Sequence, residues 1–179
     1  MTIEAIAEAA GMSRRTISRY VDAKEELAFV HPLLWWEVFA EALTDHADVA
    51  PVDRLQIASS AIAAHIDGDP DPPRRAFRVA ATHPELLSGF NSVFRLWVDR
   101  LTGVIEAMLK DSLHADLADG GLAHRLESRI VASAIMGMVD AITRDWVFAE
   151  SATYGELGDE GFETLRPILE RTLGSPEDP

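Results

Sequence analysis

The spacing of apolar residues constrains this chain most, because it follows a helical period along nearly the whole sequence. The clearest case lies between Phe90 and Leu109, where apolar side chains recur every three or four residues. Such spacing is typical of the buried face of an amphipathic helix. Alternation with a period of two is never sustained, so strands are not expected. The sequence therefore predicts an all-α fold.

Turn signals divide this pattern into about eight helical segments. Two short helices are expected within residues 2–21, and a third is expected from Lys24 towards His46, with Leu34 and Val38 on its buried face. Later helices are predicted over residues 52–66, 74–82, 90–109, 122–148 and 162–173. Between the last two, residues 151–161 contain three glycines and are expected to form a loop.

The composition excludes several classes of protein. The chain has no cysteine, and it shows neither a run of about 18 apolar residues nor a signal-peptide pattern, so we expect a cytoplasmic protein. The histidines lack metal-ligand spacing. Phosphate-binding loops, nucleophile motifs and paired catalytic carboxylates are also not recognisable. We therefore expect no metal, no cofactor and no enzymatic activity.

The basic residues near the N-terminus stand out, because the net charge of the chain is −14. Residues 11–24 hold Arg14, Arg15, Arg19 and Lys24 against a single acidic residue, Asp22. Two short helices joined by a glycine-containing turn form a helix-turn-helix, whose second helix fits the major groove of DNA. Distant acidic residues are screened beyond about 8–10 Å. The pattern indicates double-stranded DNA as a partner, although an ordinary solvated helix explains the charge equally well.

The stretch "TIEAIAEAAGMSRRTISRYVDAKEEL", residues 2–27, closely resembles the DNA-binding segment of TetR-type transcriptional regulators. It has the threonine-led helix, Ala-Ala-Gly, a capping serine, the recognition helix and a closing Lys-Glu-x-Leu. The rest of the chain matches this family in architecture alone. The resemblance implies a ligand-responsive repressor that binds a palindromic operator as a homodimer and responds to a small-molecule effector.

The same resemblance assigns roles to individual residues of this segment. Arg14, Arg15 and Thr16 would contact base edges or nearby phosphates, while other residues would hold the DNA backbone. One departure is Ser18, where the family often has an aromatic residue. The predicted DNA-binding residues are Thr2, Ser13, Arg14, Arg15, Thr16, Arg19, Tyr20 and Lys24.

Members of this family carry a further helix before the segment that here begins at Thr2. Without it, Ile6 and Ile17 would lose part of their apolar cover. Two explanations remain open: a helix encoded upstream of a start codon assigned too late, or a DNA-binding head that has decayed. The second implies an alternative function, namely a helical ligand-binding or dimerisation module without DNA binding.

The predicted organisation has two parts, with residues 1–46 forming the incomplete helix-turn-helix head and connecting helix. Residues 47–179 would form the ligand-binding and dimerisation domain. A stripe of apolar and small residues on the two last long helices predicts the dimer interface, since a palindromic operator needs a two-fold partner. An intramolecular core would explain the stripe as well. The predicted interface residues are Leu126, Ile130, Ala134, Gly137, Ala141, Phe162, Leu165 and Leu169.

Aromatic residues are concentrated in the middle helices, where the resemblance implies a pocket for the effector. A plain hydrophobic core would account for the same aromatics. Asp140 and Arg144 lie one turn apart and could anchor a polar ligand, or form an ion pair at the helix surface. The candidate pocket residues are Trp35, Phe39, Phe90, Phe94, Trp97, Asp140 and Arg144.

Overall fold

The computed structural model describes residues 30–82, 87–112, 122–149 and 151–174, and every regular element among them is an α-helix. The all-α prediction is confirmed for this part of the chain. The short helices expected within residues 2–21 lie outside it. The elements are α3 (Val30–Asp45), α4 (Pro51–Gly68), α5 (Asp71–Thr82), α6 (Leu87–Ser112), α7 (Leu122–Phe148) and α8 (Tyr154–Leu173).

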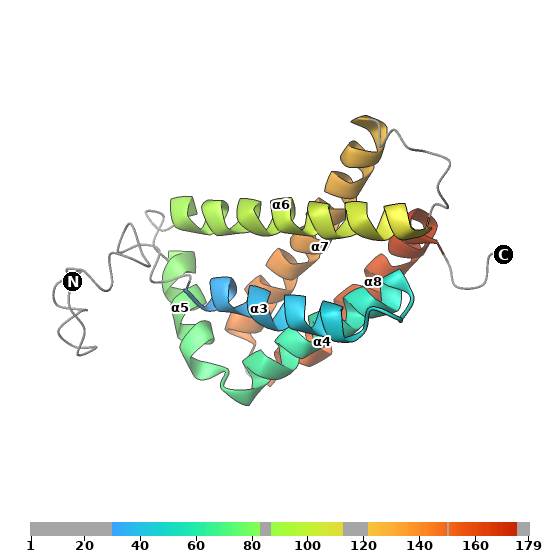
Figure 1. The fold of residues 1–179 in the computed structure, drawn as a ribbon. Helices are drawn as coiled ribbons and strands as arrows, with labels where there is room; N and C mark the ends of the chain where they lie inside the picture. The colour runs from blue at the N-terminus through green and yellow to red at the C-terminus, as the bar shows by residue number, and fades with distance from the viewer. Residues whose placement is uncertain (1–29, 83–86, 113–121, 150, 175–179) are drawn as a thin grey trace, which may run out of the picture.

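The helices pack in two interlocking sets that share α8. α7 packs on α6 and α8, while α4 packs on α3 and α8. In Figure 1, α6 and α3 run across the molecule one above the other, and α7 crosses behind α6 at a steep angle. The first turns of α7 extend beyond α6 as a projecting arm. This crossed arrangement places the middle of each long helix at the centre of the molecule.

A single hydrophobic core joins these helices. Trp146 of α7 and Leu101 and Ile105 of α6 are completely buried, and they meet Phe162 and Leu169 of α8 there. Each fully buried side chain of this kind contributes about 1.5–3 kcal/mol to stability. The core therefore depends on apolar residues contributed by helices that are far apart in the sequence.

The buried face of α3 differs from the expected one. Leu34 is 56% exposed, whereas Trp35, Phe39 and Leu43 are buried. The helix is rotated by one position relative to the prediction because this orientation buries two large aromatic rings, which remove more apolar area from water than Leu34 and Val38 would. Since α3 packs in the same core as the later helices, its described residues are structurally part of the body.

The start of α8 was predicted wrongly, because residues 154–161 are helical and not a loop. Thr153 Oγ1 accepts a hydrogen bond from the Glu156 N–H at 3.1 Å, and Glu156 Oε2 accepts one from the Thr153 N–H at 2.9 Å. This capping box satisfies the first backbone donors of the helix. The hydrogen bond from the Thr153 N–H also lowers the pKa of the Glu156 carboxyl group. The capping box therefore starts the helix at Tyr154 in spite of the three glycines that follow, which by themselves disfavour a helix.

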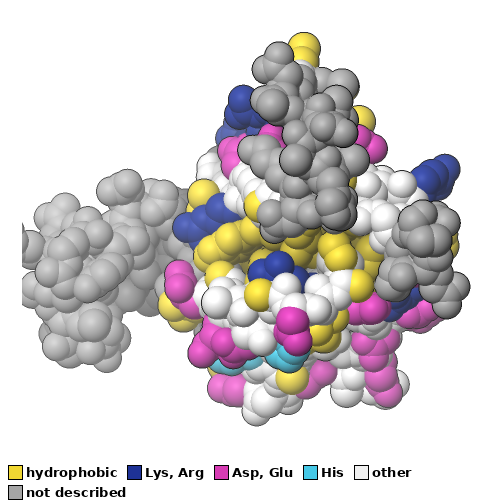
Figure 2. Space-filling model, turned by 45° about the vertical axis from the view of Figure 1, so that its right-hand side comes forward, with side chains coloured by type: hydrophobic (Ala, Val, Ile, Leu, Met, Phe, Trp, Pro, Cys, Tyr) yellow, Lys and Arg dark blue, Asp and Glu magenta, His cyan; other side chains and the backbone are white. Residues whose placement is uncertain are grey.

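The surface of the described residues carries both hydrophobic and charged side chains. Figure 2 shows a band of hydrophobic side chains across the middle of one face, with acidic side chains gathered over the lower part. Among the described helices, none is long and apolar enough to cross a membrane.

Candidate functional site

A cavity of about 100 Å³ lies at the centre of the molecule, and all six described helices contribute to its wall. The space is large enough for several water molecules or one small organic molecule. Its wall is mainly apolar, as is usual for ligand pockets. The aromatic side chains in the wall are Trp35, Phe39, Phe77, Phe94, Trp97, Tyr154 and Phe162.

The aromatic rings on α3 and α6 hold each other in position. The Trp97 ring centroid lies 5.9 Å from that of Phe39 at an interplanar angle of 62°, and 5.1 Å from that of Trp36 at 81°. Edge-to-face pairs of this kind contribute about 0.5–1.5 kcal/mol each beyond burial. The indole N–H of Trp97 donates to the carbonyl of Pro32 at 3.0 Å. Trp97 is therefore oriented by contacts with α3, without needing a ligand.

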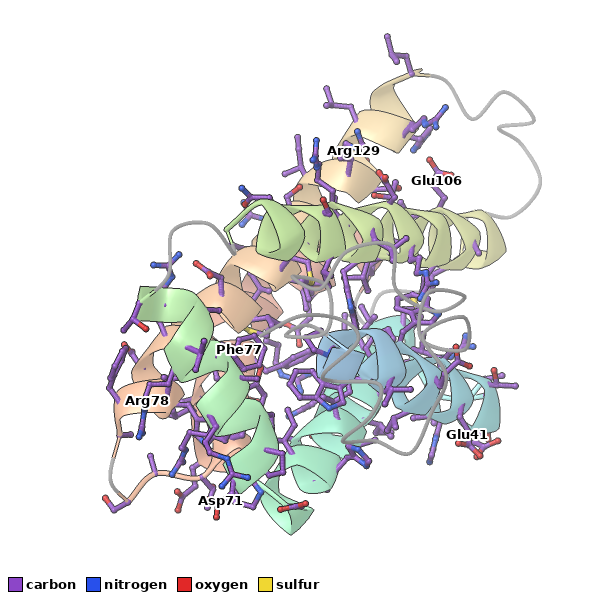
Figure 3. The ribbon with its side chains drawn as sticks, turned by 90° about the vertical axis from the view of Figure 1, so that its left-hand side faces the viewer. Glu41, Asp71, Phe77, Arg78, Glu106 and Arg129 are labelled. Atoms are coloured by element: carbon purple, nitrogen blue, oxygen red, sulfur yellow. The ribbon has the colours of Figure 1, made fainter. Side chains whose placement is uncertain are left out.

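Phe77 closes the wall on the side of α5. Its ring centroid lies 5.9 Å from that of Trp35, and Figure 3 shows it on the side of α5 that faces the other helices. The next residue, Arg78, donates from Nη2 to the carbonyl of Val147 at 2.8 Å. Because this carbonyl is in the last turn of α7, the guanidinium also stabilises the negative end of that helix. Arg78 thereby ties α5, and Phe77 with it, to α7.

A buried pair of hydroxyl groups lies in the cavity wall, where Thr143 Oγ1 is 3.2 Å from the phenol oxygen of Tyr154. Burial raises the pKa of the Tyr154 phenol above its ordinary value, and the nearby Asp67 carboxylate raises this pKa further against the opposing effect of the Thr143 hydrogen bond. The phenol is consequently neutral at physiological pH. It is one of the few polar groups that the cavity wall presents.

Asp67 positions Tyr154 from the opposite helix. Its Oδ1 accepts from the Tyr154 N–H at 2.8 Å, and its Oδ2 accepts from the Gly155 N–H at 2.9 Å. A carboxylate at this place satisfies two free donors of the first turn of α8 and interacts favourably with the helix dipole. A Cβ at Gly155 would lie only 3.1 Å from Asp67 Oδ2, so the glycine permits this close approach.

Most of the predicted pocket residues lie together in the wall of the cavity. Trp35, Phe39, Phe94, Trp97 and Asp140 line the cavity, and their role in binding stays a prediction. Phe90 belongs to α6, but its side chain lies outside the described residues.

Arg144 was wrongly placed in the pocket. It is absent from the cavity wall, 73% of its side chain is exposed, and its Nε donates to Asp140 Oδ2 at 2.8 Å. The structure thus has the surface ion pair that the sequence allowed as an alternative. Arg144 follows Asp140 by four positions on one helix, so its long side chain reaches Asp140 along the outer surface while the guanidinium stays in water.

Sequence reasoning missed Phe77, Thr143 and Tyr154. The signal for Tyr154 was present, because Thr153 and Glu156 have capping-box spacing that marks a helix start at this position. Phe77 and Thr143 carry no comparable local signal, since each stands alone in its helix and meets its partners only in the folded chain.

The predicted DNA-binding residues all precede Val30 and lie outside the described part of the chain.

The predicted interface residues on α7 lie mostly at the surface. Leu126 and Ile130 are 57% and 60% exposed, Gly137 and Ala141 are also exposed, and Ala134 is half-buried.

The interface prediction is wrong for the three residues on α8. Phe162, Leu165 and Leu169 are 2%, 9% and 0% exposed, because their apolar stripe packs against α4 and α7 within the same chain. A partner subunit cannot reach them. The intramolecular core left open by the sequence explains this stripe.

No group of three or more metal-ligating side chains comes together among the described residues. The polar groups of the cavity wall are hydroxyls, an amide and carboxylates. Comparison with protein-family models, with curated proteins and with solved structures finds no match for this chain.

Proposed function

We propose that this protein is a ligand-responsive transcriptional repressor of the TetR type, which binds a palindromic operator as a homodimer. In this proposal residues 30–174 form the effector-binding and dimerisation part, and the helix-turn-helix of residues 2–21 contacts DNA. The observation that carries the proposal is the aromatic cavity at the centre of the helices.

The cavity is a space that protein interiors usually lack, because they are packed as densely as organic crystals. Pockets for small molecules are typically lined by apolar and aromatic side chains with a few polar groups. A space of about 100 Å³ with a wall of this kind supports a role for the cavity in effector binding.

The position of α3 supports a link between effector and DNA. Trp35 and Phe39 of α3 line the cavity, and α3 follows residues 1–29 directly in the chain. The bond from Trp97 to the Pro32 carbonyl joins this end of α3 to α6. An effector that prefers one arrangement of α3 and α6 would therefore shift the arrangement of the head.

The exposed face of α7 supports the homodimer. Leu122, Leu126 and Ile130 are 86%, 57% and 60% exposed at intervals of four residues along the N-terminal part of α7. Further along the same helix, a Cβ added at Gly137 would meet nothing within 4 Å. Large exposed apolar side chains followed by a flat stretch are typical of a surface that another helix covers. A second copy of α7 related by a two-fold axis fits this pattern.

Selection from a random duplex library tests the DNA-binding part of the proposal. The full chain should retain duplexes that share a two-fold symmetric sequence. Arg14→Ala should weaken binding to the selected sequence by about 1–3 kcal/mol if the arginine contacts a guanine, while binding to random DNA changes little. Lys24→Ala should weaken binding to all sequences alike and reduce the salt dependence.

Arg171→Ala is the matched control, since Arg171 is an exposed arginine in the last turn of α8. This variant should bind the selected duplex as the parent protein does. Failure of the parent chain to select any sequence would contradict the repressor and favour the ligand-binding module without DNA binding. Equal losses for Arg14→Ala and Arg171→Ala would remove Arg14 from sequence recognition.

A further inference from the structure

The charged groups among the described residues of the cavity wall are all of one sign. Asp140 of α7 and Asp159 of α8 line the cavity, and lysine, arginine and histidine are absent from its described lining. Since the rest of this described lining is aromatic, aliphatic or neutral polar, none of its side chains could neutralise an anionic ligand. A buried anion without a partner is strongly unfavourable. The wall therefore selects against carboxylates, phosphates and sulfonates.

The Asp140 carboxylate is available to a ligand on one side. Its Oδ2 accepts the hydrogen bond from Arg144, and no described side chain donates to its Oδ1. The side chain of Asp140 is 28% exposed, against 73% for Arg144. Asp140 is thus the more desolvated member of the pair, and its charge acts through a lower effective dielectric than a surface carboxylate would have.

Arg166, which also contacts the cavity wall, is balanced by acidic groups. Its Nη1 lies 3.0 Å from Asp53 and 3.6 Å from Glu170, and its Nε lies 3.3 Å from Glu163. The same guanidinium donates to Gln56, whose side chain lines the cavity. One positive charge facing three carboxylates leaves the surroundings of Arg166 negative.

The aromatic wall is also suited to a positive charge. The faces of tryptophan and phenylalanine rings carry negative electrostatic potential, and rings arranged around a space bind organic ammonium groups. One ring of the wall and one ring beside it already have an arginine nearby: Arg166 lies 5.6 Å from the centroid of the wall residue Phe162, and Arg100 lies 5.0 Å from that of Trp36, which is outside the cavity lining. The net charge of −14 would further raise the local concentration of cations.

We propose that the cavity binds a small lipophilic cation, an aromatic or alkyl amine or quaternary ammonium compound, with its apolar part among the rings and its charge next to Asp140. This inference rests on the proposed function, because it names the effector class for the same cavity. Arg144 then competes with the ligand for Asp140, and the exposed arginine can move into water when the ligand binds.

Two probes of the same shape test the sign of the charge. Trimethylphenylammonium and tert-butylbenzene differ in one atom and one charge, and benzenesulfonate supplies an anion of similar size. Calorimetric titration of the full chain should show the cation binding about tenfold more tightly than its neutral isostere. Benzenesulfonate should bind more weakly than either.

Variants on α7 locate the interaction. Asp140→Asn should weaken cation binding by about fivefold, in the range of one partly exposed ion pair, and leave tert-butylbenzene binding unchanged. Asp145→Asn is the control, because Asp145 is an exposed carboxylate on the same helix that does not line the cavity. Arg144→Gln should strengthen cation binding, because it removes the competing guanidinium.

The outcomes separate this inference from the function on which it rests. Equal affinity for the cation and the isostere, or equal effects of Asp140→Asn and Asp145→Asn, would overturn the cation inference and leave the effector cavity in place. Failure of all three probes to bind would contradict the effector cavity itself. Selective binding of the cation, lost in Asp140→Asn alone, is the result expected.

Discussion

At the scale of single residues, Asp67 joins the end of α4 to the start of α8. Its carboxylate accepts two backbone N–H bonds from the first turn of α8, from Tyr154 and Gly155. Hydrogen bonds to a charged group contribute about 1.5–3 kcal/mol. We therefore expect Asp67→Ala to lower the free energy of unfolding by about 2 kcal/mol, measured by urea denaturation.

Asp69→Ala is the control for this prediction. Asp69 is an exposed residue two positions along the chain, and at the end of α4 its backbone N–H bonds to Ile66, which alanine retains. The change should be below about 0.5 kcal/mol, as for most surface substitutions. Similar losses in both variants would show that Asp67 acts through the general charge of this region and not through its bonds to α8.

At the scale of elements, the approach of α8 to α7 depends on Gly161. A Cβ at this position would lie 2.8 Å from Ile142 Cδ1 and 3.0 Å from Met138 Cγ. Overpacking of this kind costs about 1–3 kcal/mol, which exceeds the helix-propensity gain of about 1 kcal/mol. We expect Gly161→Ala to lower the free energy of unfolding by about 1 kcal/mol, measured by chemical denaturation.

Gly158→Ala, one turn earlier on α8, supplies the comparison. A Cβ there would meet nothing within 4 Å, so alanine should stabilise the helix by about 0.5–1 kcal/mol. Opposite signs for the two variants are the expected result. If both substitutions stabilise the protein alike, α8 has room to move away from α7 and the close contact at Gly161 is not essential.

At the scale of the whole molecule, the exposed face of α7 is expected to hold two copies together. Gly137 lies in the flat part of this face, so Gly137→Glu would bury a charge between the two helices, which is strongly unfavourable. We expect the parent protein to sediment as a dimer at micromolar concentration and the variant as a monomer. Far-UV circular dichroism should show the helical content of the variant unchanged.

Gly103→Glu on α6 is the matched variant, since Gly103 is an exposed helical glycine with nothing within 4 Å of an added Cβ. It should remain dimeric, because α6 is not part of the proposed interface. A monomeric parent protein would contradict the homodimer. Dissociation of both variants would mean that added negative charge, and not its position on α7, separates the subunits.

Properties that depend on one helix at a time could be predicted from the sequence. The helical period alone established the all-α class, and it placed α7 at residues 122–148, as observed. Trp35, Phe39, Phe94 and Trp97, which the family resemblance placed in a pocket, line the cavity. The extent of a helix can be predicted because hydrophobic periodicity is a local property of the sequence.

Only the tertiary structure decided which neighbouring helix, if any, covers the apolar face of each helix. The stripes on α7 and α8 look alike in the sequence, yet Ile130 is 60% exposed and Leu169 is completely buried. Asp140 had two possible roles, and only the folded chain places it both in the cavity wall and next to Arg144. Asp67 meets α8 across 87 positions of the chain. A sequence indicates through its own period where a helix lies and that it is amphipathic, but the exact face that is buried, as α3 shows, and the neighbour that covers it depend on how all the helices pack together.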